Sequence, residues 1–263
     1  MKTFDYLNEY YNSRNEDERL DSRHGQVEYL TTMRYIQKYS KPEMKILEVG
    51  AGTGRYSIAL AKLGCTVEAV ELIPHNIDIF KHKITAEENV VVRQGNAKDL
   101  SCFADASFDI TLVLGPMYHL YTVDDQKQAL SEAIRVTKNG GLLFSAYCIS
   151  DASVICDAFK GGHIFEYISK GLIDTETFKT FSTPEDLFQL YRKEDIDALD
   201  SGFNVTRLHY VATDLMTNYM REVIDAMDDE LFVMYLKYHF AVCERSDLVG
   251  ATHHSLDILR KVK

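Results

Sequence analysis

The stretch Lys45-Ile46-Leu47-Glu48-Val49-Gly50-Ala51-Gly52-Thr53-Gly54-Arg55-Tyr56 decides the fold. It joins an apolar run typical of a β-strand to a turn with alternating glycines, and helix-forming residues follow at once. A strand, a glycine turn and a helix N-terminus in this order bring backbone N–H groups up against a ligand. The third glycine comes one residue earlier than in the dinucleotide-binding pattern G-x-G-x-x-G, and Glu48 precedes the first glycine. The turn therefore predicts a ligand site of another kind.

Strand and helix patterns alternate outward from this turn. Gly64 ends the first helix at a position that glycine favours, and Pro74 opens the next at a position that proline tolerates. Repeated βα units indicate a parallel sheet with helices on both faces and a ligand crevice at the carboxyl ends of the strands. The predicted strands are 45–49, 65–72, 90–94, 108–114 and 142–148, the predicted helices are 55–63, 74–83 and 124–137, and 139–141 is a predicted turn.

The remaining segments complete the sheet and extend it. Strands over 204–212 and 252–260 make the fold class α/β, a Rossmann-like, doubly wound, mostly parallel seven-stranded sheet with helical cap insertions. Helices are expected over 25–39, 214–227 and 229–245, and Ser182–Asp186 reads as another helix N-terminus. We expect one domain over 1–263, with an N-terminal helical lid (1–40), a cofactor-binding core (41–150) and substrate-cap helices with closing strands (151–263).

Composition limits the classes of partner. The net charge of −11 argues against a general nucleic-acid binder and against anionic membrane surfaces. The sequence has no apolar run of membrane-spanning length, and its start lacks the apolar region of a signal peptide. Its five scattered cysteines lack C-x-x-C spacing, so we expect neither a disulfide framework nor a metal site. These features predict a cytoplasmic protein without a nucleic-acid or membrane partner.

Polar residues follow the predicted strands in register. Glu71 ends the second strand, 17 residues after Gly54, where a carboxylate can accept hydrogen bonds from ribose hydroxyls. Asn96 follows the third strand, and a short polar side chain there can read the edge of an adenine ring. Alone, Glu71 reads better as a solvated charge and Asn96 as a turn former. Only their joint spacing with the glycine turn favours a binding role.

This set resembles the class I S-adenosylmethionine-dependent methyltransferases of the small-molecule, UbiE-like type. The matching motifs are LEVGAGTGRYS, AVEL, QGNAKDL, FDITLVLGPMYHL and NGGLLFSAY, in the family's order and spacing. The resemblance covers residues 45–148 strongly and the remaining chain weakly, through FSTPEDL, GFNV and the closing strand. It implies S-adenosyl-L-methionine as cofactor, S-adenosyl-L-homocysteine as product, and transfer of a methyl group to a small-molecule acceptor by in-line displacement.

The resemblance also implies a role for each matching residue. Glu48 helps to anchor the cofactor's amino group, and Glu71 binds the ribose hydroxyls. Asn96 hydrogen-bonds the adenine amino group; many relatives have Asp there, but an Asn carbonyl oxygen also accepts. The other implied contacts are the methionine and ribose part for Gly50, Ala51, Gly52 and Gly54, packing on adenine for Leu72, and backbone contacts for Ala97 and Leu114.

The sequence indicates the residues around the methyl acceptor less clearly. His119 follows the fourth strand, where an acceptor would meet the methyl group, and its ordinary pKa range suits a general base; packing of His119 against the next segment is an equal alternative. Tyr118 either orients the acceptor or packs on the cofactor. In the N-terminal segment, Tyr10, Tyr11, Arg14, Arg23 and His24 are candidates to close over the cofactor. His253 and His254 read as structural or exposed histidines.

Two other functions remain open from the sequence. The first is an NAD-dependent oxidoreductase on a Rossmann fold, against which the early third glycine and Glu48 speak. The second is a non-catalytic module that binds S-adenosylmethionine, because no residue is chemically compulsory for this displacement. The acceptor, the methylated atom, the use of a general base and the oligomeric state are not determined by the sequence.

Overall fold

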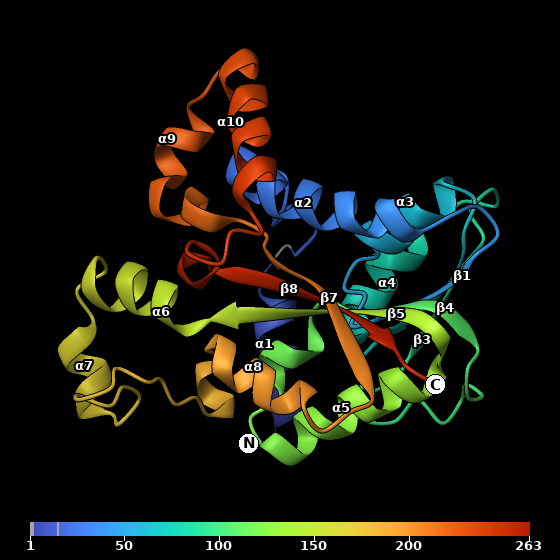
Figure 1. Cartoon of the computed structure of the whole chain (residues 1–263), viewed down its shortest axis with the longest axis horizontal. Coiled ribbons are helices and arrows are strands. Elements are labelled where there is room, and N and C mark those ends of the chain that lie inside the picture. Colours follow the sequence, from blue (N-terminus) through green and yellow to red (C-terminus); the bar gives the residue numbers. More distant parts are fainter. Residues whose placement is uncertain (1–2, 15) are drawn as a thin grey trace.

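A central, mostly parallel β-sheet organises the chain in the computed structural model, which describes residues 3–14 and 16–263 (Figure 1). Its strand order is β3-β2-β1-β4-β5-β8-β7, and the short β6 pairs with β5 off this path. All seven predicted strands are confirmed, and β6 is an additional one. The strands are β1 (Lys45–Val49), β2 (Thr66–Glu71), β3 (Val90–Gln94), β4 (Phe108–Val113), β5 (Thr137–Ile149), β6 (Leu190–Tyr191), β7 (Val205–Ala212) and β8 (His254–Lys261).

Parallel pairing aligns the ends of the strands that carry the predicted motifs. Val49, the last residue of β1, pairs with Val70 in β2 and Val113 in β4, and Glu71 pairs with Gln94 in β3. The carboxyl ends of these four strands therefore lie at one edge of the sheet. The loops that follow them converge there, as the βα pattern predicts.

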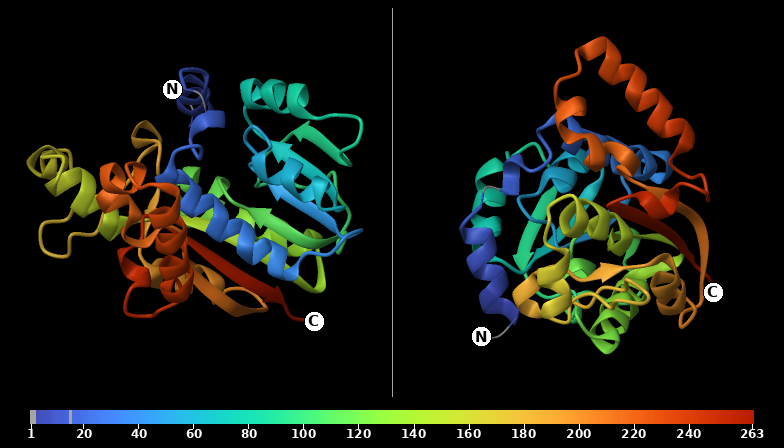
Figure 2. Two further views of the ribbon diagram at one scale, coloured as in Figure 1. Left: turned by 90° about the horizontal axis from the view of Figure 1, so that it is seen from above. Right: turned by 90° about the vertical axis from the view of Figure 1, so that its left-hand side faces the viewer.

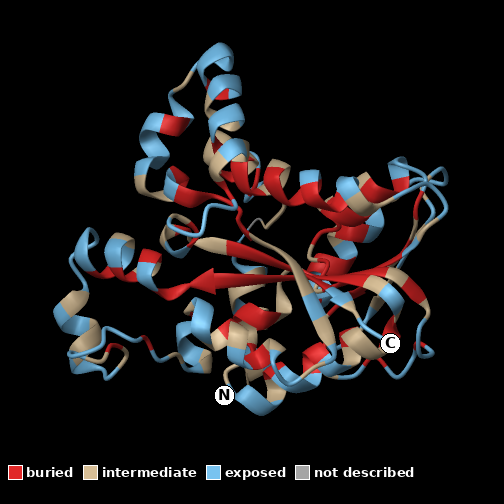
Figure 3. Cartoon of the chain, viewed as in Figure 1, coloured by how far each residue is buried: buried red, intermediate tan, exposed pale blue. Residues whose placement is uncertain are grey.

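Helices cover both faces of the sheet (Figure 1). On one face, α2 (Arg23–Tyr39) and α3 (Arg55–Lys62) bury apolar side chains against the sheet; on the other, α5 (Val123–Val136) and α8 (Lys193–Asp200) do so. The helix α4 (Pro74–Lys83) packs Phe80 beside the glycine turn. Figure 3 shows the result as buried strands between helices with exposed outer faces.

Local sequence signals set the ends of several helices. Ser22, Thr122 and Asp228 each accept a backbone N–H with the side chain at the start of α2, α5 and α10 (Asp229–Val242), respectively. After α3, Gly64 adopts a φ of +88°, as expected of a glycine that ends a helix. These caps satisfy backbone groups that a helix leaves unpaired at its termini.

Three predicted elements differ from the structure. Strand β5 begins at Thr137, so the predicted turn 139–141 lies within an irregular strand whose register with β4 shifts between Phe108 and Ile110. The expected helix at 182–186 is one 3-10 turn, Pro184–Asp186, closed by hydrogen bonds between Thr183 and Asp186. The expected helix at 214–227 divides into a 3-10 segment, Leu215–Met220, and α9 (Arg221–Asp225).

Two helical arms and an N-terminal helix surround the strand ends. One arm contains α6 (Ser150–Ser153), a π-helix (Val154–Phe159) and α7 (Ile164–Ser169), and the other contains α9 and α10. Figure 2 shows both arms standing away from the sheet. The helix α1 (Thr3–Asn12) precedes a 3-10 turn at Glu16–Glu18, and Tyr6 donates a hydrogen bond to Glu185 at 2.6 Å. Among the described residues, no helix is both long and apolar enough to cross a membrane.

Candidate functional site

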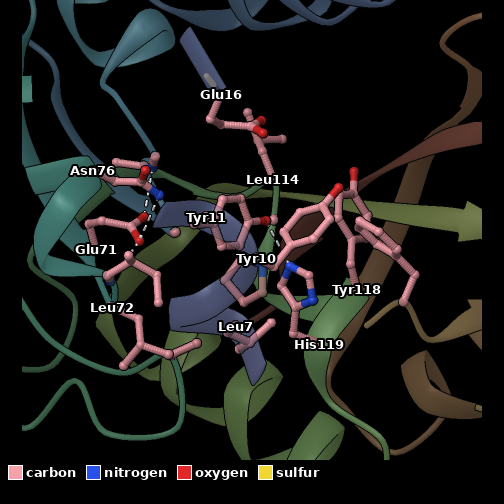
Figure 4. Close-up of a pocket in the computed structure, with 18 of the residues that line it drawn as sticks. Leu7, Tyr10, Tyr11, Glu16, Glu71, Leu72, Asn76, Leu114, Tyr118 and His119 are labelled. Carbon is pink, nitrogen blue, oxygen red and sulfur yellow. Dashed lines mark hydrogen bonds between the residues drawn. The ribbon is translucent and has the colours of Figure 1, made fainter. Parts of the chain in front are cut away.

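A cavity of about 680 Å³ lies at the carboxyl ends of the parallel strands. Its size is in the range of small-molecule pockets. Figure 4 shows Glu71, Leu72 and Asn76 on one side of it, and Tyr118 and His119 on the other, with α1 contributing Leu7, Tyr10 and Tyr11. The predicted site residues that line it are Glu48, Gly50, Ala51, Gly52, Glu71, Leu72, Asn96, Ala97, Leu114, Tyr118 and His119.

The glycine turn contributes space to this cavity. Gly52 has a φ of +54°, and a β-carbon added there meets nothing within 4 Å, so Gly52 leaves a part of the wall open. The turn's N–H groups, however, bond within the protein. Those of Gly50 and Ala51 bond to the carbonyl of Val70, and that of Gly52 bonds to Glu71. The expectation that these N–H groups face a ligand is therefore wrong for these residues.

Gly54 has a different role from the one that the family resemblance implies. It is not among the residues that line the cavity. Its φ is +84°, it precedes α3, and a β-carbon there would lie 2.2 Å from the ring of Phe80. Gly54 is thus required for the close packing of the turn on α4, and its spacing alone does not distinguish this role from ligand contact.

Glu71 ties the glycine turn to the end of β2. One carboxylate oxygen accepts from the N–H of Gly52 at 2.7 Å, and the other accepts from the N–H of Ile73 at 2.9 Å. The side chain is 5% exposed, and burial raises its pKa although these bonds oppose the shift. The oxygen bonded to Ile73 also accepts from the Asn76 amide at 3.5 Å, whereas the oxygen bonded to Gly52 keeps a further lone pair for a hydroxyl donor at the cavity wall.

Glu48 is a buried carboxyl group behind the turn. It is 1% exposed, and burial raises its pKa to about 8 although Ser57 donates a hydrogen bond to it. A cationic group in the cavity would favour its ionised form and lower its pKa. Position and chemistry therefore suit an ammonium partner.

The third predicted cluster is the loop after β3. Asn96 is exposed at the rim, and its side-chain oxygen accepts from the N–H of Lys98 at 3.0 Å, as in an Asx turn. Asn76 on α4, which the sequence motifs do not indicate, also lines the cavity; it is buried, and its side-chain oxygen has no hydrogen-bond partner among the described residues. Its position two residues after Pro74, in the first turn of α4, was the available signal.

His119 lies on the wall of the cavity opposite Glu71 and Asn76 (Figure 4). Its Nδ1 is 2.7 Å from the carbonyl oxygen of Leu187, which only accepts, so Nδ1 carries the proton. Its Nε2 lies 2.9 Å from the hydroxyl of Tyr11 and therefore accepts from that O–H. Burial lowers the pKa of His119 to about 4, against the effect of the Leu187 carbonyl. The imidazole is thus neutral near pH 7, with its basic nitrogen toward the lid.

The N-terminal segment covers this wall through several contacts. Tyr10 packs edge-on against Phe188 at 5.7 Å between ring centroids, and Arg55 donates to the carbonyl of Asp17 at 2.6 Å. Among the predicted lid candidates, Tyr10, Tyr11 and His24 line the cavity, whereas Arg14 and Arg23 do not. Tyr118 is buried beside His119, and burial raises the pKa of its phenol well above the ordinary value.

Fold and site together define a class: a Rossmann-like α/β enzyme with its pocket at the strand ends. Residues 47–145 match the family model described as "Methyltransferase domain". This match covers less than half of the chain, and together with the fold it supports a class I S-adenosylmethionine-dependent methyltransferase of UbiE-like type with S-adenosylmethionine as cofactor. The alternative of an NAD-dependent oxidoreductase is thereby set aside.

Three known proteins illustrate the similarity. The ubiquinone biosynthesis O-methyltransferase of Pseudomonas fluorescens (strain Pf0-1) is 29% identical over 182 residues, which cover 67% of this chain and 76% of that protein. Its counterpart in Cereibacter sphaeroides (strain ATCC 17025 / ATH 2.4.3) is 28% identical over 159 residues, 60% of this chain but only 62% of that protein. A solved S-adenosylmethionine-dependent methyltransferase of Thermotoga maritima, a possible histamine N-methyltransferase, shares the fold with a TM-score of 0.59 at 18% identity; the match covers 99% of this chain and 100% of that one.

The residues present fit this cofactor. The open wall at Gly52 would be filled by a β-carbon, and Glu48 is a buried carboxyl group whose ionised form a cation would stabilise. Within residues 3–14 and 16–263, the buried side-chain oxygen of Asn76 has no hydrogen-bond partner. These three observations match a ligand that carries an ammonium group, a sulfonium and polar nucleoside edges.

Proposed function

We propose that this chain methylates a hydroxyl group of a small-molecule acceptor, with His119 as the general base. This proposal rests on the orientation of the His119 imidazole. Its Nδ1–H donates to the Leu187 carbonyl, which leaves the lone pair of Nε2 to accept a proton. The names of the curated relatives, ubiquinone biosynthesis O-methyltransferases, favour oxygen as the methylated atom. No nucleic-acid partner is proposed, in keeping with the net charge of −11.

The cofactor half of the cavity would hold S-adenosylmethionine. We assign Glu48 to its amino group, Glu71 to its ribose hydroxyls and Leu72 to the adenine face. When bound, this cofactor supplies a methyl group on a sulfonium for in-line displacement. Asn96, Ala97 and Leu114 remain the proposed contacts to adenine and to the methionine part, while Asn76 is an added candidate through its unpaired buried oxygen.

Tyr11 would connect the acceptor to His119. Its phenol donates to Nε2 at 2.9 Å, so an acceptor hydroxyl that donates to the Tyr11 oxygen completes a relay. As the acceptor oxygen bonds the methyl group, its proton moves to Tyr11 and the phenol proton of Tyr11 moves to Nε2. The result is a methyl ether, an unchanged Tyr11 and a His119 imidazolium. Such proton transfer contributes about 10²–10⁴-fold to a rate.

We also propose the division of the chain into lid (1–40), core (41–150) and cap (151–263) around this pocket. Contacts of Tyr11 with His119 and of Tyr6 with Glu185 support the lid assignment, since they join α1 to the core and the cap. A cytoplasmic location is proposed as well. All five cysteines are free thiols, which suits a reducing compartment.

The test is methyl transfer from radiolabelled S-adenosylmethionine to an extract of small metabolites, followed by identification of the labelled product. We expect a labelled ether and a much slower reaction with His119→Ala. Binding of the cofactor without any transfer would instead support the non-catalytic module. Label on nitrogen, sulfur or carbon would reject the hydroxyl assignment.

A further inference from the structure

A continuous chain of polar contacts runs along the acceptor end of the cavity. Arg221 on α9 donates to the Asn218 side chain at 2.6 Å, and Asn218 donates to Asp214 at 2.5 Å. Asp214 lies 2.7 Å from Nδ1 of His254. The chain continues through Glu28, whose oxygen lies 3.5 Å from the same nitrogen and whose two oxygens accept from Arg19. Its members come from the lid, α2, the α9 arm and β8.

The surroundings of His254 favour its charged form. Burial opposes the charge, but Glu28 and Asp214 beside Nδ1 raise its pKa well above the ordinary value. Asp214 is itself ionised: burial works against this, yet the His254 cation and its hydrogen bonds hold the pKa at about 2. Since Nδ1 donates to carboxylates, Nε2 of an imidazolium has a second N–H to donate.

The carboxylates at this end have their oxygens engaged by donors of the protein. Arg19 bonds both oxygens of Glu28 at 3.0 Å. Asp214 accepts from Thr252 and the N–H of His253 with one oxygen and from Asn218 and His254 with the other. A divalent cation at Glu28, Asp214 and His254, which lie close enough to share one, would have to displace these donors.

N–H groups of two cationic side chains at this end of the cavity remain available to a ligand. The side chain of His254 is 21% exposed, and both His254 and Arg221 line the cavity. Nε of Arg221 donates to Asn218, and its terminal nitrogens form no ion pair with a carboxylate in the described part of the chain. Cationic N–H donors of this kind recognise oxygen anions.

We propose that the acceptor carries an oxyanion, a carboxylate or a phosphate, which His254 and Arg221 bind while the hydroxyl to be methylated lies at Tyr11. This inference rests on the proposed function, because it divides the same cavity into cofactor, reacting and anchoring parts. Asp214 and Glu28 are positioning residues, since they act on the acceptor only through His254. Their ion pairs with His254 favour the imidazolium, whose Nε2–H donates to the anionic acceptor.

The test measures binding of four probes of similar size by calorimetry, with S-adenosylhomocysteine present at saturation. Benzoate and phenyl phosphate are the anions, benzyl alcohol is neutral and benzylamine is a cation. We expect the anions to bind at least tenfold more tightly than benzyl alcohol. The stronger of the two anions identifies the carboxylate or the phosphate as the preferred group. Tighter binding of benzylamine than of either anion would overturn the proposal.

Variants locate the effect. His254→Gln should weaken anion binding by about tenfold, as expected for loss of a charged hydrogen bond. Arg221→Gln, on an exposed residue whose loss should not disturb folding, should weaken it by about threefold. His163→Gln and Arg245→Gln are matched controls, since each residue pairs with a carboxylate outside the cavity. Unchanged anion affinity in both His254→Gln and Arg221→Gln would reject the site.

The same experiment separates the two levels of the assignment. The affinity for S-adenosylhomocysteine should be unchanged in His254→Gln and Arg221→Gln. This affinity tests the cofactor site alone. If that affinity and methyl transfer are intact but anions have no advantage, only the oxyanion inference fails. A separate calorimetric titration uses MgCl₂ or ZnCl₂ alone. If a divalent cation binds the unmodified chain but not His254→Gln, the cluster of Glu28, Asp214 and His254 is a metal site and the oxyanion inference is overturned.

Discussion

The two halves of the cavity are built in different ways. The cofactor half comes from consecutive strand ends between Glu48 and Leu114, brought together by parallel pairing of β1 with its neighbours. The acceptor half joins Arg19 and Glu28 near the N-terminus to Arg221 and His254 near the C-terminus. The first half thus depends on local motifs in a regular sheet, and the second depends on tertiary contacts between distant segments.

The halves also differ in their electrostatics. Buried Glu48 has a pKa raised to about 8, because no strong cationic partner offsets its burial, whereas buried Asp214 is held at about 2 by His254. The first environment favours a cationic ligand, whereas in the second His254 already neutralises the carboxylate of Asp214 and has a further N–H for an anionic ligand. Variants in one half should therefore alter cofactor affinity, and variants in the other should alter acceptor binding or turnover.

The largest effect is expected from Gly52→Val. The new side chain enters the cavity at a position where nothing lies within 4 Å, so it should abolish binding of S-adenosylhomocysteine in calorimetry. A non-glycine residue at a φ of +54° also costs about 1–3 kcal/mol of stability, which circular dichroism would record as a lower melting midpoint.

Gly54→Ala is the matched control for this effect. Its β-carbon would meet Phe80 instead of the cavity, so it should lower the free energy of unfolding by about 1–3 kcal/mol through overpacking. Folded Gly54→Ala should still bind the cofactor. If Gly54→Ala lost affinity and Gly52→Val kept it, the division between open wall and packing contact would be reversed.

His119→Ala should reduce kcat by about 10²–10⁴-fold while cofactor affinity stays nearly constant, because the proton relay loses its base. Tyr11→Phe should cause a comparable loss if the phenol passes the proton. His82→Ala is the control, since His82 also bonds a backbone carbonyl through Nδ1 but lies exposed on α4. Full activity of His119→Ala would return this residue to a packing role.

A smaller change is expected from Glu71→Ala. Loss of acceptors for the ribose hydroxyls and of the bonds that hold Gly52 and Ile73 should weaken cofactor binding by about tenfold to a hundredfold. Glu68→Ala, on the same strand but paired with Arg93 outside the cavity, should leave affinity unchanged. Equal affinities of the two variants in calorimetry would remove Glu71 from the site.

The mildest test is the pH dependence of kcat. Protonation of His119 removes its basic lone pair, so activity should be lost as the pH falls through about 4 instead of near the ordinary histidine pKa of 6.5. His239 and His253 also have pKa values lowered to about 4 by burial, so their contribution to stability should decline between pH 6.5 and 4, where these two groups bind more protons in the unfolded chain. Circular dichroism at each pH separates this loss from that of the base; an acid limb near 6.5 in folded enzyme would contradict the prediction.

The residues that line the proposed cofactor half were largely predictable from the sequence. The strand that ends at Val49 and the acidic residue Glu71 follow short-range rules, and parallel pairing fixes where they meet. The error at Gly54 arose because a glycine needed for packing on Phe80 and a glycine beside a ligand give the same pattern.

The acceptor half could not be predicted in the same way. His254 was interpreted as a structural or exposed histidine because its charge depends on Glu28, more than two hundred residues earlier in the chain. Likewise, nothing near Tyr11 in sequence indicates that its hydroxyl meets His119. These contacts result from how the arms and the lid pack around the sheet.

The most direct test of this division is a crystal structure of the chain with S-adenosylhomocysteine. We predict ribose hydroxyls on the Glu71 carboxylate, the amino group near Glu48, and the sulfur facing the space between Tyr11 and His119. A ligand whose ribose lies away from Glu71, or whose sulfur faces away from His119, would contradict the assignment of the two halves.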